Sequence, residues 1–88
     1  MKAIVTVLGK DKVGIIAKVS GTLSEMDVNV EDISQTVMQD YFAMMMMVEV
    51  PSSGDMNKIA QKLEELGNTV GVTIRIQHED IFNAMHRI

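Results

Sequence analysis

The chain has 88 residues, a formal net charge of −4 and no Cys. This length accommodates one domain that buries only a modest share of its surface. The absence of Cys excludes disulfides, thiolate metal sites and thiol catalysis, and the negative charge disfavours a nucleic-acid partner. The apolar run after Met1 ends at Gly9, too early for a signal peptide or a membrane span. We therefore expect a cytoplasmic protein with no membrane partner.

Strand and helix patterns alternate along the chain. The predicted elements are a strand at 3–8, a helix at 15–26, strands at 28–38 and 41–50, a helix at 56–66, a strand at 70–76 and a C-terminal amphipathic helix within 79–88. Asp11 and Asp55 stand where helix N-caps are expected, and Gly67 where a C-cap is expected. Glu31 and Asp32 break the alternation of the second strand, which predicts a bulge there.

This order of elements predicts an α+β fold, the ferredoxin-like βαββαβ sandwich. Its four-stranded antiparallel sheet would carry two helices on one face, with a short C-terminal helix following. We assign residues 1–78 to this domain and residues 79–88 to an amphipathic helical tail.

The third predicted strand is apolar on both of its sides. One side carries Phe42, Met44, Met46 and Val48, and the other carries Ala43, Met45 and Met47. A monomer with helices on one face would leave the second set in water. We therefore expect either the tail helix or a second subunit to cover that face, and we expect a homodimer. The strand at 28–38 is expected at a sheet edge, where unpaired amides invite a neighbour.

Several kinds of chemistry lack an essential group. His78 and His86 match no standard metal-binding spacing, and the sulfurs of residues 44–47 alternate between two faces, so they cannot converge on one ion. No nucleophile elbow is present. Tyr41 and Phe42 lie on opposite faces, so they do not form the stacking platform of an RNA-binding sheet. We therefore predict no enzyme, no cofactor and no metal site.

The loop between the first strand and the first helix, residues 9–15, is the remaining candidate for a site. Free amides at a helix N-terminus suit a carboxylate, and Gly14 allows a close approach by a ligand. Asp11 offers a partner for an ammonium group, and the pair of charges is that of an amino acid. The alternative is that the loop provides only a turn and a cap, and both interpretations remain open at this point.

Two segments resemble the ACT-domain pattern. Residues 11–17, Asp-Lys-Val-Gly-Ile-Ile-Ala, are similar to its D/N-x-x-G-hydrophobic loop, and residues 28–30, Val-Asn-Val, to its Val-Asn-Ile-like entry to the second strand. Residues 32–36 and 77–88 resemble small stand-alone bacterial and archaeal ACT proteins, which are akin to the ACT halves of glycine-cleavage regulators. Val13 stands where many members have Pro.

The resemblance implies a binding function, because ACT domains typically bind amino acids or other small effectors between paired domains. Carried over by position, the ligand contacts are Asp11, Gly14 and Asn29, with their neighbours Val13, Ile15 and Val30. The first functional hypothesis is a regulatory homodimer that binds an amino-acid effector and signals to a partner protein in trans. The alternative is a structural dimerisation module without a ligand.

Overall fold

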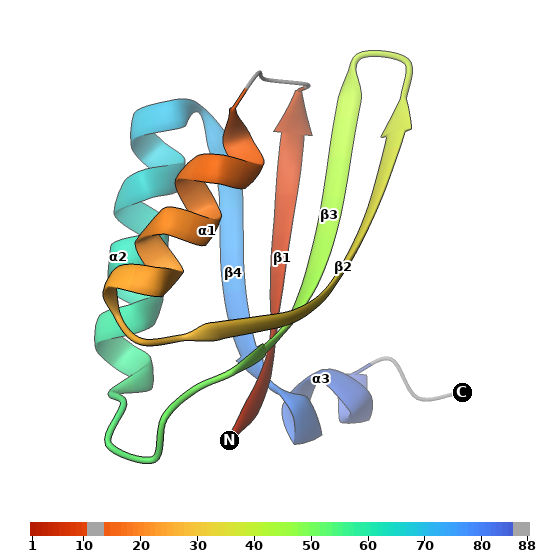
Figure 1. Cartoon of the computed structure of the whole chain (residues 1–88). Coiled ribbons are helices and arrows are strands. Elements are labelled where there is room, and N and C mark those ends of the chain that lie inside the picture. Colours follow the sequence, from red (N-terminus) through yellow and green to blue (C-terminus); the bar gives the residue numbers. More distant parts are fainter. Residues whose placement is uncertain (11–13, 86–88) are drawn as a thin grey trace.

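The computed structural model describes residues 1–10 and 14–85. The elements are β1 (Lys2–Lys10), α1 (Ile15–Glu25), β2 (Asn29–Met38), β3 (Tyr41–Glu49), α2 (Met56–Val70), β4 (Val72–His78) and α3 (Glu79–Met85). The strands form one antiparallel sheet in the order β2-β3-β1-β4, and α1 and α2 cover one face of it (Figure 1). The predicted ferredoxin-like sandwich with a short C-terminal helix is confirmed.

The core lies between the sheet and the two long helices. The two central strands pair in register over nine residues, from Lys2 opposite Glu49 to Lys10 opposite Tyr41. Their helix-facing side chains are all buried: Ala3, Val5 and Val7 on β1, and Phe42, Met44, Met46 and Val48 on β3. The helices add Ile15, Val19, Leu23, Ile59 and Leu63 to the same cluster. The alternation predicted for the third strand is therefore confirmed.

The two long helices begin in different ways. Asp55 caps α2 as predicted, because its carboxylate accepts from the amides of Asn57 at 2.9 Å and Lys58 at 3.4 Å. The N-cap of α1 is Gly14, which lies in the left-handed region with φ of 84° and provides no side-chain cap. The predicted cap at Asp11 is wrong, because α1 begins three residues later than such a cap requires. Asp11 itself lies outside the described residues.

The predicted C-cap at Gly67 is wrong. Helix α2 continues to Val70 and ends at Gly71, whose φ of 82° and N–H bond to the Gly67 carbonyl at 2.8 Å close the helix. Gly67 is a buried helical residue, and a Cβ built on it would lie 2.5 Å from the carbonyl oxygen of Val72. Gly67 therefore permits the close approach of α2 to β4 rather than ending the helix.

Strand β2 is an edge of the sheet, as predicted. Its ladder to β3 shifts register between Val30 and Asp32, which confirms the predicted bulge. Glu31, the extra residue, accepts a hydrogen bond from the ammonium of Lys2 on β1, and this bond raises the pKa of Lys2. Of the residues in β2 only Val30 is half-buried, and the others are exposed.

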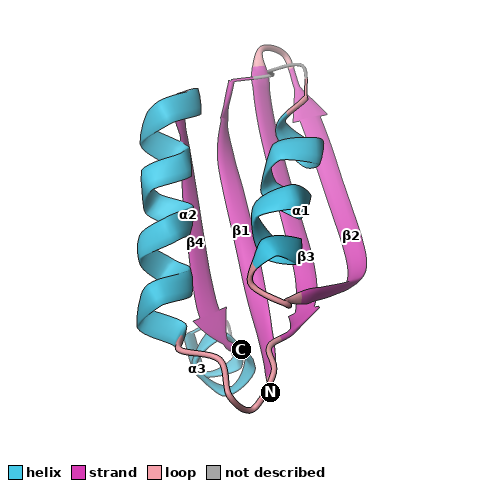
Figure 2. Ribbon diagram, turned by 60° about the vertical axis from the view of Figure 1, so that its left-hand side comes forward, coloured by secondary structure: helices cyan, strands magenta, loops and turns pink. Residues whose placement is uncertain are grey.

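Helix α3 lies against β1 and β4, on the side of the sheet away from α1 and α2 (Figures 1 and 2). The side-chain amide of Gln77 donates to the sulfur of Met85 at 3.3 Å, and the neighbouring Ile4 is only 7% exposed. Ile81 and Met85 nevertheless stay 55% and 65% exposed. Met85 therefore meets the sheet through its sulfur, but α3 buries little of the apolar stripe predicted for the tail. Ile88, the last residue of the stripe, lies outside the described residues.

No helix within residues 1–10 and 14–85 is both long enough and apolar enough to cross a membrane.

A pair of glycine substitutions tests the contact between α2 and β4. Gly67→Ala should destabilise the fold by about 1–3 kcal/mol, because backbone rather than a flexible side chain must move. Gly21→Ala in α1 is the control, because nothing lies within 4 Å of a Cβ there. That change should stabilise the fold by about 0.5–1 kcal/mol through helix propensity. Urea denaturation followed by circular dichroism measures both, and effects of the same sign would contradict the close approach.

Candidate functional site

A pocket opens between the first turn of α1 and the helix-facing side of β2. Its volume is about 570 Å³, within the range of small-molecule sites. The residues that line it are Gly14, Ile15, Ile16, Ala17, Gln35, Val37 and Phe42. It therefore combines a helix N-terminus with a largely apolar wall.

The register of the β2–β3 ladder explains which residues of β2 reach this pocket. Gln35 lies opposite Met44 and Val37 opposite Phe42, and both partners face the helices. Because directly opposed residues share a face of the sheet, Gln35 and Val37 also point to the helix side. Helix α1 does not cover this edge, so Val37 remains 56% exposed.

The start of α1 contributes four residues to the lining, Gly14, Ile15, Ile16 and Ala17. The first hydrogen bond of α1 runs from the N–H of Lys18 to the carbonyl of Gly14 at 3.0 Å. The amides of Ile15, Ile16 and Ala17 precede that bond, so they are the donors that a helix start leaves without an intrahelical acceptor. The helix dipole makes this end favourable for an anion. Among the described residues of the lining, Gln35 provides the one polar side chain and none carries a charge.

Two of the predicted site residues, Gly14 and Ile15, line the pocket. Asp11 and Val13 lie outside the described residues.

Asn29 and Val30 lie at the far end of β2 from this pocket. Eleven residues of α1 separate that end from Gly14, a distance of about 16 Å along the helix axis. Asn29 lies opposite Glu49, on the sheet face away from α1, whereas Val30 lies opposite Val48 on the helix side. A single subunit therefore does not bring Asn29 to the loop before α1.

Sequence reasoning missed five of the lining residues: Ile16, Ala17, Gln35, Val37 and Phe42. The first two follow the loop motif directly and could have been assigned with it. Gln35 and Val37 require the bulge to be placed first, because it decides which residues of β2 face the helices.

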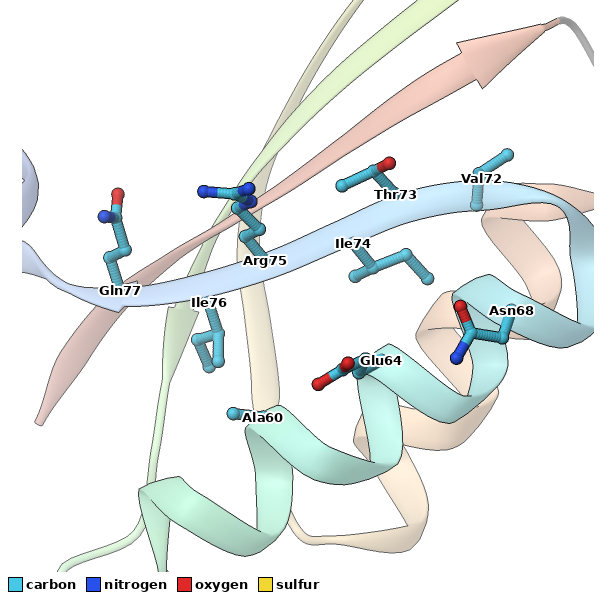
Figure 3. A pocket seen from close by; sticks show the side chains of 9 residues that line it. All are labelled: Ala60, Glu64, Asn68, Val72, Thr73, Ile74, Arg75, Ile76 and Gln77. Carbon is cyan, nitrogen blue, oxygen red and sulfur yellow. The ribbon is translucent and has the colours of Figure 1, made fainter.

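A second hollow of about 520 Å³ lies between α2 and the free edge of β4. Ile74 and Ile76 point towards α2, whereas Arg75 points to the other side of the strand, away from Glu64 on α2 (Figure 3). Its charged groups therefore do not converge on one point, which makes it a weaker candidate than the pocket beside α1.

The comparisons with known proteins identify the family. The family model described as "ACT domain" matches residues 2–77. A UPF0237 protein of Clostridium acetobutylicum is 54% identical, and the match covers the whole of both chains. The solved structure of an ACT domain protein from Streptococcus pneumoniae is 48% identical with a TM-score of 0.84, over 98% of each chain.

A more distant structure shares the fold. It is a putative glycine cleavage system transcriptional repressor, 18% identical with a TM-score of 0.76, over 86% of this chain and 44% of that one. The chain therefore belongs to the ACT domain family and, within it, to the UPF0237 proteins. The resemblance found in the loop, the strand entry and the tail is confirmed.

Substitutions at Gly14 test its left-handed backbone. Gly14→Ala should cost about 1–2 kcal/mol, because φ of 84° is unfavourable for a residue with a Cβ. Nothing lies within 4 Å of that Cβ, so the loss reports backbone strain alone. Gly14→Asn should cost less, since Asn tolerates this conformation. Equal losses in chemical denaturation would show that the conformation of Gly14 does not control the stability of α1.

Proposed function

We propose that this protein is a regulatory homodimer that binds a small amino acid with an apolar side chain. The observation that carries the proposal is the pocket beside α1, where the predicted residues Gly14 and Ile15 meet an apolar wall. Membership of the ACT domain family supports a binding role rather than a catalytic one. The output of such a protein would pass to a partner protein in trans.

The lining suggests the chemistry of the ligand. A carboxylate would accept from the free amides of the first turn of α1, where the dipole favours negative charge. An apolar side chain would lie against Val37 and Phe42, while Gln35 offers an amide for hydrogen bonding. An ammonium group needs a charged partner, because burying an unpaired charge is costly, and Asp11 is the residue we assign to it.

We place the homodimer interface at the exposed edge of β2. Two copies of β2 can pair in antiparallel fashion about a two-fold axis, which satisfies the unpaired amides of both edges. This pairing sets the start of the partner's strand beside the end of the first, on the side where Gly14 lies. Val30 of the partner subunit would then lie on the helix side of this edge and could complete the site that a single chain leaves open, whereas Asn29 of the partner subunit would lie on the other face of the sheet.

A thermal-shift screen against the free amino acids tests the binding function. At about 100 times its Kd a ligand adds roughly 2.7 kcal/mol of stability, which raises the melting temperature visibly in a domain of this size. We expect the rise with apolar amino acids and not with acidic ones. No shift with any amino acid would favour the alternative, a structural dimerisation module without a ligand.

Two matched substitutions locate the binding site. Ala17→Glu places a carboxylate in the first turn of α1, which the helix dipole tolerates but which repels a ligand carboxylate. We expect calorimetry to show that binding is weakened by a factor of about ten or more. Ala60→Glu makes the same change on α2, beside the β4 hollow, and should leave binding intact. If Ala60→Glu weakened binding and Ala17→Glu did not, the ligand would bind in the hollow between α2 and β4 instead.

Mixing two variants tests whether the site spans two subunits. Val30→Ala and Ala17→Glu should each weaken binding alone. In an equimolar mixture after unfolding and refolding, a heterodimer contains one site with both native residues. We therefore expect recovery of about a quarter of the sites if the chains pair at random. Absence of recovery would mean that Val30 does not act across a subunit boundary.

A further inference from the structure

Strand β4 forms the second edge of the sheet. Its ladder to β1 runs from Gly9 opposite Val72 to Ala3 opposite His78 without a shift of register, and in the described part of the chain no strand pairs with its other side. The amides and carbonyls on that side are a template for one more extended chain. Because the ladder of β4 lacks the bulge that interrupts β2, an added strand can follow this edge over its full length.

The hollow of about 520 Å³ runs along this free edge, between β4 and α2. The two elements are antiparallel (Figure 1) and approach each other closely at Gly67, where an added Cβ would lie 2.5 Å from the carbonyl oxygen of Val72. Along the hollow, four residues of a helix advance about 6 Å and two residues of a strand about 7 Å. One side chain of α2 therefore accompanies every second residue of β4 (Figure 3), in the pairs Asn68 with Val72, Glu64 with Ile74, and Ala60 with Ile76.

The two charged side chains of the hollow lie on opposite sides of β4. Glu64 is exposed on the helix side, whereas Arg75 is exposed on the other face of the strand (Figure 3). Within residues 1–10 and 14–85, no hydrogen bond or ion pair engages either side chain. A strand beside β4 sends successive side chains to these same two sides. Two neighbouring residues of such a strand can therefore meet both charges.

The pairs along the hollow define the side chains that an added strand needs. Opposite Ile76 an apolar side chain fits, because Ala60 is small and Ile76 is still half-buried. Opposite Arg75, on the other face, an acidic side chain is favoured, and opposite Ile74 a basic side chain reaches Glu64. In a strand antiparallel to β4 the order from the N-terminus is therefore apolar, acidic, basic.

The protein's own sequence does not contain this order in either direction. None of its 12 Asp and Glu residues stands between an apolar residue and a basic one. The segment that suits the edge of β4 therefore belongs to another protein rather than to a second copy of this chain.

We propose that an extended segment of a partner protein adds to the edge of β4 as a fifth strand. Its apolar, acidic and basic residues lie opposite Ile76, Arg75 and Ile74. Main-chain hydrogen bonds to β4 supply the affinity, and the two charges set the register and the choice of partner. The hollow shares no residue with the pocket beside α1, so this inference stands independently of the proposed function.

Two matched peptides test the site by NMR titration. The probe is the heptapeptide Thr-Thr-Val-Glu-Lys-Thr-Thr with both ends capped, and the control peptide, Thr-Thr-Val-Lys-Glu-Thr-Thr, exchanges its two charges at constant composition. With isotope-labelled protein and no amino acid present, we expect the probe to shift the amide signals of β4 and of the side of α2 that faces it. The control peptide should bind about tenfold more weakly, because both of its charges then meet like charges.

Charge-exchanged protein variants show which residues choose the peptide. Glu64→Lys combined with Arg75→Glu should reverse the preference, so that the control peptide binds about tenfold more tightly than the probe. Glu65→Lys makes the same charge change as Glu64→Lys but lies outside the hollow, and it should keep the preference of the parent. The amide spectrum of each variant also shows whether it is folded.

The outcomes decide the proposal without reference to the amino-acid pocket, because the titrations contain no amino acid. If neither peptide shifts any amide signal at millimolar concentration, or if the shifts lie only at β2, the site at β4 is wrong. Equal binding of the two peptides by the parent also overturns the proposal. A double variant that keeps the parent's preference does the same, since Glu64 and Arg75 then do not choose the partner.

Discussion

The packing of the two central strands is the constraint on which the rest of the structure depends. β1 and β3 pair over their whole length, and both carry apolar side chains on both faces. Two helices bury one set, and α2 approaches closely because Gly67 has no side chain. Among the described residues, α3, a helix of seven residues, is the element that lies against the second set. The coverage of the two faces is therefore unequal.

The sequence predicted the elements well because their signals are local. The alternation in β3, the Asp55 cap and the break at Glu31 each depend on a few neighbouring residues, and each appears where the pattern placed it. The predicted C-cap at Gly67 was wrong because the role of this residue is not set by its neighbours in the sequence. A glycine near the end of an apolar stripe looks like a C-cap, but its role is set by Val72, which lies across the helix–strand contact. Only the tertiary structure contains that information.

The residues of the candidate site fall into the same two groups, those with a local sequence signal and those that depend on the tertiary structure. Gly14 and Ile15 were found from a loop motif and do line the pocket, whereas Gln35 and Val37 depend on the register of a strand distant in sequence. Asn29 lies at the other end of β2 and on the other face of the sheet, so one chain does not bring it to the pocket. A motif assigned by position gives the residues but not the number of subunits needed to bring them together.

The bulge in β2 has a consequence for how far assembly can proceed. A sheet with two free edges, β2 and β4, is at risk of adding strands without limit. The bulge bends and twists the start of β2, and Glu31 reaches back across the sheet to Lys2 on β1. An incoming strand must match the shift of register between Val30 and Asp32 to follow the whole of β2. The bulge thus restricts which strands can extend the sheet at this edge.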